Sequence, residues 1–308
     1  MSRGENALVR WLQGRFEVRS DRIEVGIGDD AAVLRLGGAC VAITTDMLLD
    51  GVHFDARVHT YEQIGRKAIA CSLSDCAAKA CHPRAATVSI ALNDAMTLTD
   101  VQRLYEGMAV LADEFDCPIV GGDTTSWTSP LVIDVAMLAE PMSPRGPVLR
   151  SGARVGDAIF VSGPLGGSLL GKHLTFAPRL DLSARLAAEP ALHAMMDISD
   201  GLSMDLDRLC LASGCGAELN ADLLKSVISE DARAMARQDG RSPLDHALND
   251  GEDYELLVVG EASLGRSGLG LLPVGRVVSP RHDMPTMILA FSDGRREPIE
   301  PKGFEHFR

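Results

Sequence analysis

A run of proline and glycine residues near the middle of the chain constrains its fold more than any other feature. The run comprises Pro141, Pro144, Gly146, Pro147 and Gly152. Helices and central strands rarely continue through such a stretch, which is typical of a linker. About 150 residues lie on each side, enough for a domain with its own core. The sequence therefore predicts two domains, residues 1–148 and 149–308.

Both halves alternate strand-like and helix-like segments, a pattern that predicts an α/β fold. In the first half we expect strands near residues 39–45, 85–92, 118–121 and 131–139 and helices over 61–80 and 99–115. The second half opens with a strand at 157–162 and a glycine-rich turn. It continues with a strand ending at Ile198, a helix over 201–212, and strands near 255–260, 271–278 and 287–291.

Charge and hydropathy exclude several classes of protein. The formal net charge of −13 argues against a nucleic-acid partner, because phosphate backbones are bound by clustered Lys and Arg. A membrane helix needs roughly 20 apolar residues, and the best candidate, residues 131–139, contains Asp134. The first fifteen residues mix charges with Leu8, Val9, Trp11 and Leu12, so we expect no signal peptide and a cytoplasmic protein. The seven cysteines show no zinc spacing and are expected to be reduced thiols.

Six short acidic clusters, flanked by Gly, Ser or Thr, are the most informative motifs. We expect each at the end of a strand. They are Gly28-Asp29-Asp30, Thr44-Thr45-Asp46, Ser74-Asp75, Gly121-Gly122-Asp123-Thr124, Asp197-Ile198-Ser199-Asp200-Gly201 and Gly251-Glu252-Asp253. Magnesium takes oxygen ligands and is commonly held by one or two carboxylates plus substrate phosphates. The alternative for any single cluster is a helix cap or a turn, where Asp beside Gly or Ser is common.

A second glycine-rich segment resembles a phosphate-binding P-loop but lacks a required residue. Gly166, Gly171 and Lys172 fit the spacing, yet His173 follows where a Ser or Thr hydroxyl should bind magnesium. A helix is also expected through residues 168–171, where a P-loop needs an open nest of backbone N–H groups. The segment is therefore predicted to be a strand-to-helix turn.

Taken together, the clusters resemble the signature segments of the thiamine-monophosphate kinase family. Further matching segments are His53-Phe54, Leu73-Ser74-Asp75, Arg150-Ser151-Gly152-Ala153, Asp253-Tyr254-Glu255-Leu256 and Gly303-Phe304-Glu305-His306-Phe307. The resemblance covers nearly the whole chain. The wider superfamily, which includes aminoimidazole-ribonucleotide synthetases, selenophosphate synthetases and hydrogenase-maturation proteins, shares the architecture but not this complete set.

The resemblance implies a magnesium-dependent transfer of the γ-phosphate of ATP to thiamine monophosphate. Several magnesium ions would be held by Asp30, Thr44, Thr45, Asp46, Asp75, Asp123, Asp197 and Asp200. ATP would contact Gly122, Asp123, Arg150 and Ser199. Thiamine monophosphate would be bordered by His53, Glu252 and Phe304. Singly, Arg150 could be a surface charge, His53 a structural residue, Glu252 a solvated turn residue and Phe304 a packing residue.

The resemblance further implies a two-domain architecture in which the amino-terminal sheets of two subunits pair in a homodimer, with the ATP site near that interface. Two rivals remain: a related ATP-dependent synthetase, and a nucleotide or metal sensor without catalysis. Selenophosphate synthetase uses an amino-terminal Cys or selenocysteine, whereas no Cys precedes Cys40 here. Three departures from the family pattern are a short connection from Gly171 to Pro178-Arg179, Ala80 in place of Gly, and Asp250 before Gly251, which would add a carboxylate beside the thiamine site.

Overall fold

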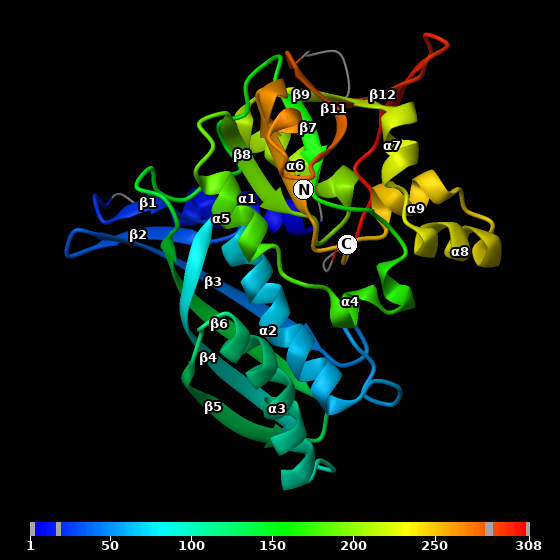
Figure 1. Ribbon diagram of the computed structural model, residues 1–308. Helices are drawn as coiled ribbons and strands as arrows, with labels where there is room; N and C mark the ends of the chain where they lie inside the picture. Colours follow the sequence, from blue (N-terminus) through cyan, green and yellow to red (C-terminus); the bar gives the residue numbers. More distant parts are fainter. Residues whose placement is uncertain (1–3, 17–19, 281–285, 306–308) are drawn as a thin grey trace.

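The computed structural model describes residues 4–16, 20–280 and 286–305 and shows two mixed sheets, each covered by helices (Figure 1). His306 and Phe307, which belong to the carboxyl-terminal motif, lie outside the described residues. In the first sheet, β4 and β5 run parallel and the other neighbours antiparallel. Its strands, in spatial order, are β1 (Ile23–Val25), β2 (Ala32–Leu36), β3 (Ala39–Leu49), β6 (Val132–Pro141), β4 (Cys81–Asn93) and β5 (Ile119–Trp127).

Two long helices cover one face of this sheet, α2 (Tyr61–Ala78) and α3 (Leu98–Glu114). Each begins at a threonine in a capping box, Thr60 with Gln63 and Thr97 with Asp100. The helices pack very closely, because a Cβ atom on Gly65 would lie 1.9 Å from the Leu104 carbonyl oxygen. Such close contact holds α2 firmly against both α3 and the sheet, which fixes the side chains that α2 carries.

The second sheet is built by the carboxyl-terminal half, and its only parallel pair among the described strands is β9 with β12. Its strands, in spatial order, are β13 (Arg296–Ile299), β12 (Met287–Ala290), β9 (Gly216–Asn220), β11 (Leu272–Val278), β7 (Ala158–Val161), β10 (Leu256–Gly260) and β8 (Leu192–Asp197). The remaining helices are α1 (Glu5–Arg15), α4 (Lys172–Thr175), α5 (Leu180–Ala187), α6 (Leu202–Ser213), α7 (Ala221–Val227), α8 (Glu230–Asp239) and α9 (Pro243–Asn249). Among the described residues, no helix is long and apolar enough to span a bilayer.

One hydrophobic core runs from the first sheet into the second. Buried residues of α2 and β6, such as Leu73 and Val135, belong to the same apolar cluster as Phe160 of β7 and Leu256 of β10. A separate cluster lies among the strands of the second sheet and helices α6 and α7. Because α2 also contacts β8, α4 and α5, this helix joins the two halves of the chain.

The predicted α/β alternation is confirmed, with element ends shifted by a few residues. The expectation that every acidic cluster stands at a strand end is wrong for four of them. Residues 44–46 lie inside β3, Asp75 lies inside α2, and residues 121–124 lie inside β5. Residues 251–253 follow helix α9 and precede β10. Strand β5 tolerates polar residues because it is an exposed edge strand, and Asp46 of β3 is hydrogen-bonded.

The expected helix over residues 168–171 is a single 3₁₀ turn, Ser168–Leu170, followed by α4. The glycine-rich segment before it explains the difference, because Gly166, Gly167 and Gly171 all adopt positive φ angles that interrupt a regular helix. The domain boundary near residue 148 stays a prediction.

Candidate active site

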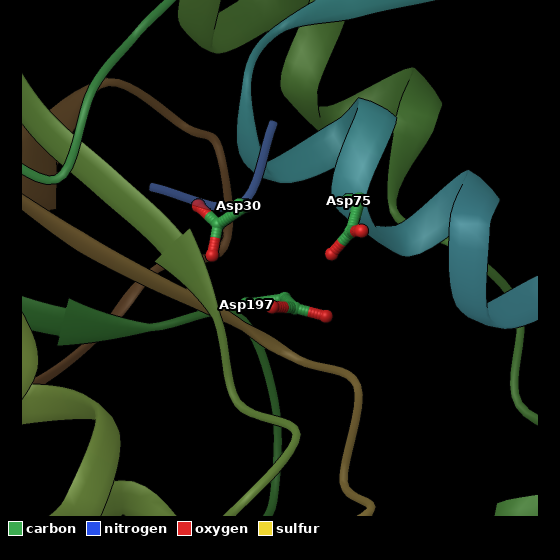
Figure 2. A group of neighbouring side chains, drawn as sticks. All are labelled: Asp30, Asp75 and Asp197. Carbon is green, nitrogen blue, oxygen red and sulfur yellow. The ribbon is translucent and has the colours of Figure 1, made fainter. Parts of the chain in front are cut away.

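Three aspartates from distant parts of the chain, one buried and two partly buried, meet where the two sheets approach each other. Asp30 precedes β2, Asp75 lies on α2, and Asp197 is the last residue of β8. One carboxylate oxygen from each lies within 4.8 Å of the others, and Figure 2 shows the three side chains gathered in one place. The cluster is therefore assembled by tertiary packing and needs both halves of the chain.

Hydroxyl groups orient the carboxylates of this cluster and of its neighbour Asp46. Thr44 on β3 donates a hydrogen bond to Asp75. Ser74, one residue away on α2, donates to Asp197 at 2.6 Å, and Ser72 donates to Asp46 at 2.7 Å. Strand β3 and helix α2 thus face each other with alternating hydroxyls and carboxylates, which fixes the carboxylate oxygens in space.

Two cations lie on one side of the cluster and hold Asp30. The fully buried Lys79 amine contacts both Asp29 and Asp30, and the Arg150 guanidinium donates to Asp30, with 2.9 Å from Nε to Oδ1. Burial acts to raise the pKa of Asp30, but Arg150 and Lys79 outweigh it and lower that pKa to about 2. Asp30 is therefore ionised throughout the physiological pH range.

The other carboxylates of the cluster are not neutralised by neighbouring side chains to the same extent. Burial raises the pKa of Asp75 well above its usual value, and Asp46 and Asp197 raise it further by repulsion. Burial, and then repulsion from Asp30, raises the pKa of Asp197 to about 7. Burial also raises the pKa of Asp46 to about 6. Such a site favours either bound protons or a bound cation.

The donor set fits magnesium. All its atoms are oxygens, and the oxygens of three carboxylates lie within 4.8 Å of one another. Lys79, 2.7 Å from Asp30 Oδ2, offsets part of the repulsion, but the raised pKa values of Asp75 and Asp197 favour a further cation among the carboxylates. Hard oxygen ligands of this kind suit Mg²⁺ better than softer metals.

A cavity of about 450 Å³ opens beside the acidic cluster. Its lining combines polar residues, among them Asp46, Ser199 and Asp200, with apolar ones. The remaining lining residues are Thr45, Met47, Leu48, Val52, His53, Cys71, Leu169, Asp250, Glu252, Tyr254 and Phe304. Its size suits a ligand with one or two aromatic rings, and through Asp46 its lining adjoins the acidic cluster.

His53, Glu252 and Phe304, predicted from the sequence to border one substrate, line this same cavity. The Nδ1 atom of His53 accepts the backbone N–H of Leu49 at 3.0 Å, so the neutral ring carries its proton on Nε2. The rings of His53 and Phe304 lie edge to face with centroids 6.3 Å apart. The backbone N–H of Phe304 donates to the Asp200 carbonyl, which holds the segment that carries the ring beside Asp200.

Strand alternation separates the predicted residues of β3. Thr44 and Asp46 face α2, whereas Thr45 faces the opposite side, where its hydroxyl donates to Asp134 of β6 at 3.0 Å. By register, Asp123 on the edge strand β5 shares that opposite, exposed side. The structure therefore does not bring Asp123 and the Thr45 hydroxyl to the three-aspartate cluster within one chain.

Three other predicted residues lie in distinct surroundings. The side chain of Arg150 is largely buried against Asp30, unlike a linker-facing surface charge. Asp200 is paired with Arg208. Gly122 has φ +153° and packs against β4 so closely that a Cβ atom would lie 1.7 Å from the Val88 carbonyl oxygen. A glycine is therefore required there by strand packing alone.

The glycine-rich turn before α4 is closed by carboxylates, not open to phosphate. The backbone N–H of Gly166 donates to Asp253 at 2.9 Å, and that of Gly167 donates to Asp250 at 3.0 Å. Since these N–H groups are occupied, the turn lacks the open nest of a P-loop. Asp250, expected beside the thiamine site, does line the cavity, and its carboxylate also accepts from Gly167 and contacts His246.

Several functional neighbours are missing from the sequence-based prediction: Asp29, Lys67, Ser72 and Lys79. The two lysines are fully buried, Lys67 against Glu252 and Lys79 against Asp29 and Asp30. The available signal was the sequence around them: Lys67 lies in α2 and Lys79 caps its carboxyl end, and both have small apolar neighbours that the fold buries. Ser72 stands two residues before Ser74 on the same helix.

Comparisons with known proteins agree with this geometry. Family models described as AIR synthase related protein, N-terminal domain, and AIR synthase related protein, C-terminal domain, match residues 28–140 and 154–264. A thiamine-monophosphate kinase of Rhodopirellula baltica is 38% identical, with 98% of this chain and 97% of the relative covered. That of Aquifex aeolicus is 31% identical, with 91% of this chain and 92% of the relative covered.

Solved structures give the same result. The structure of "AaThiL complexed with AMPPCP and TMP" matches with a TM-score of 0.85 and 30% identity over 99% of this chain and 97% of that one. The hydrogenase maturation protein HypE of E. coli shares the fold, with a TM-score of 0.70 at 21% identity over 97% and 98% of the two chains. Nearly full-length similarity to several curated kinases, together with the two family models, shows that this chain belongs to the thiamine-monophosphate kinase family of the AIR synthase-related superfamily.

Proposed function

We propose that this chain transfers the γ-phosphate of ATP directly to thiamine monophosphate, forming thiamine diphosphate in a magnesium-dependent reaction in the cytoplasm. The observation that carries the proposal is the junction of an acidic cluster with a partly apolar cavity. The cluster of Asp30, Asp75 and Asp197 suits a metal-bound polyphosphate, and the cavity suits a ring-bearing acceptor. Family membership gives the reaction class.

Asp30, Asp75 and Asp197 would hold magnesium, with Thr44, Asp46 and Asp200 supplying further oxygen ligands. Magnesium at these positions would neutralise the charge that accumulates on the phosphoryl oxygens during transfer. The protein's own contribution is alignment. Hydrogen bonds from Thr44, Ser72 and Ser74 fix the carboxylates before substrate arrives, so little reorganisation is needed at the moment of reaction.

The acceptor phosphate needs no general base, since unlike an alcohol it can attack as an oxyanion with no proton to lose. His53 serves as a binding residue: its Nδ1 accepts the Leu49 N–H, which fixes the orientation of the ring in the lining of the cavity. We assign Glu252 and Phe304 to the thiamine moiety, whose thiazolium ring is cationic and is attracted by a carboxylate and by an aromatic face. Arg150 and Ser199 are assigned to ATP.

A direct in-line transfer inverts the configuration at phosphorus, whereas two successive displacements through a phosphoenzyme restore it. ATP made chiral at the γ-phosphorus should therefore give thiamine diphosphate of inverted configuration. Retention, or a labelled protein trapped from ATP in the absence of acceptor, would contradict direct transfer and make His53 or an aspartate the suspected nucleophile.

The reaction itself is tested by incubating purified protein with Mg·ATP and, separately, thiamine, thiamine monophosphate and an aminoimidazole precursor. Phosphorylation of thiamine monophosphate alone is the expected result. A product from the aminoimidazole compound would favour the rival synthetase activity. Binding of Mg·ATP without any product would favour the sensor.

We further propose a homodimer formed by the exposed face of the first sheet. Ile43, Met47 and Leu138 project from that face, and their exposed apolar side chains favour burial against a second copy. Thr45 and Asp123, together with Gly122 on the same strand, would then lie at the interface, which places their predicted roles in the assembled dimer. Sedimentation should show a dimer that Leu138→Glu dissociates. The matched control, Val110→Glu on the exposed side of α3, should leave the dimer intact.

A further inference from the structure

Lys67 is a fully buried lysine at the boundary between the two halves of the chain. It lies on α2, its side chain is 0% exposed, and its amine is 2.6 Å from Glu252 Oε2 and 2.6 Å from the His53 carbonyl oxygen. A buried ammonium group is expensive unless it is paired and hydrogen-bonded. Both acceptors belong to residues assigned above to thiamine monophosphate, since one is the Glu252 carboxylate and the other is the His53 backbone carbonyl.

The segment that bears Glu252 needs an external support. Glu252 and Tyr254 have positive φ angles of 53° and 49°, which are unfavourable for residues with a side chain. Helix α2 contacts this segment twice, through Lys67 to Glu252 and through Cys71, whose Sγ lies 3.1 Å from the Tyr254 hydroxyl. The strained turn is thereby held against the first half of the chain.

We propose that Lys67 is a positioning residue for the acceptor substrate, fixing the Glu252 carboxylate and the His53 segment in the geometry that binds thiamine monophosphate. Lys67 is not among the residues that line the cavity, so it acts through its two partners. The inference rests on the proposed function, because it presumes that Glu252 and His53 contact the acceptor. It adds a residue from outside the cavity that sets affinity for the acceptor and not for ATP.

A purely structural role makes a different prediction, and the neighbouring Arg66 provides the matched control. Arg66 also bridges α2 to the second half of the chain, donating to the carbonyl oxygens of Leu174 and Phe176 at 3.2 and 2.8 Å. These carbonyls are outside the residues that line the cavity. Loss of either bridge should lower thermal stability, but only loss of Lys67 should disturb acceptor binding.

The experiment compares wild type, Lys67→Met and Arg66→Met by steady-state kinetics with each substrate varied, and by thermal unfolding. Lys67→Met should raise KM for thiamine monophosphate about tenfold or more, with KM for ATP changed less than about twofold, because a carboxylate that has lost its buried partner no longer holds its place. Arg66→Met should lower Tm without changing either KM beyond about twofold.

If Lys67→Met is not recovered as folded protein, Lys67→Arg decides the question. It keeps the positive charge but its larger planar head displaces Glu252, so KM for thiamine monophosphate should still rise selectively. An unchanged KM for thiamine monophosphate, or an equal rise in both KM values, would overturn the role of Lys67. The proposed function would still stand in that case, provided that the wild-type protein phosphorylates thiamine monophosphate. A wild-type protein that does not phosphorylate thiamine monophosphate would overturn both.

Discussion

The two ends of the proposed active site are built on opposite physical principles. At one end, carboxylates from both halves of the chain are buried together, and repulsion among them is offset by Lys79, Arg150 and three hydroxyl groups. At the other end, a cavity offers apolar surface from Val52, Leu169 and Phe304 beside polar side chains such as His53 and Glu252. The acidic end is crowded with unfavourable charge; the cavity end is incompletely filled.

This difference indicates which step each end of the site serves, phosphoryl transfer at the acidic end and acceptor binding at the cavity end. Groups at the acidic end are arranged for charge that develops during phosphoryl transfer, so changes there should act mainly on kcat. Groups in the cavity are proposed to contact the acceptor equally before and during transfer, so changes there should act mainly on KM. Substitutions at each end should therefore separate the two kinetic constants.

The largest effect should come from Asp75→Asn, and Asp46→Asn should behave similarly. Removing the charge of Asp75 deprives the cluster of a central metal ligand without changing its shape, and kcat should fall roughly 10³-fold. Circular dichroism should show an unchanged fold, because burial and repulsion already oppose the ionised form of this side chain. A kcat within about twofold of wild type at saturating Mg²⁺ in both variants would contradict the assignment.

Magnesium should stabilise the protein more at high pH than at low pH. Because the folded-state pKa values of Asp46 and Asp197 are raised to about 6 and about 7, from 3.8, folding binds protons. The metal-free protein therefore loses the stability these groups contribute as pH rises through that interval. Asp30, with a pKa of about 2, acts in the opposite sense, contributing stability that is fully present above pH 3.8 and lost only as pH falls toward 2.

The proposed magnesium would bind the ionised carboxylates, so it should stabilise the protein more at the higher pH, by about 2.7 kcal/mol at a hundred times Kd. Thermal unfolding with and without Mg²⁺, at about pH 5.5 and about pH 8, measures the difference. A shift in Tm that is as large at the lower pH as at the higher one would count against binding at these aspartates. Calcium provides a useful control for ion size.

At the cavity end, Phe304→Ala should weaken acceptor binding by about 0.5–2 kcal/mol, which corresponds to a rise in KM for thiamine monophosphate of roughly 2- to 30-fold. The ring is partly exposed and edge-on to His53, so the fold should persist. KM for ATP is expected to stay unchanged. Equal effects on both substrates would indicate that Phe304 packs without contacting thiamine.

The smallest effect is expected at Asp250. Its carboxylate accepts the Gly167 N–H and contacts His246 and Arg241, so Asp250→Asn keeps an acceptor for Gly167 and removes only the charge. Both KM values should stay within about twofold of wild type, while Tm falls because His246 and Arg241 lose their partner. A marked change in preference among thiamine phosphates would show that the extra carboxylate does face the substrate.

The sequence allowed the α/β architecture and the members of the cluster to be predicted, but not their placement. Gathering of Asp30, Asp75 and Asp197 followed from the family resemblance, whereas Asp75 was expected at a strand end and lies inside a helix. The opposite orientations of Thr44 and Thr45 could have been predicted, since neighbouring residues of any strand face opposite sides. The buried positions of Lys67 and Lys79 could not have been predicted, because lysines on a helix usually extend into solvent.

The pairs that complete the site have a consequence for recombination between related genes. Ser74 is hydrogen-bonded to Asp197, Arg150 to Asp30, and Lys67 to Glu252, so each pair draws one member from either side of the predicted boundary at residue 148. A chimaera that joins the first half of one homologue to the second half of another inherits partners that were not selected together. Exchange at the linker should therefore succeed only between homologues that share these pairs, and the two halves are expected to have evolved as a single inherited unit.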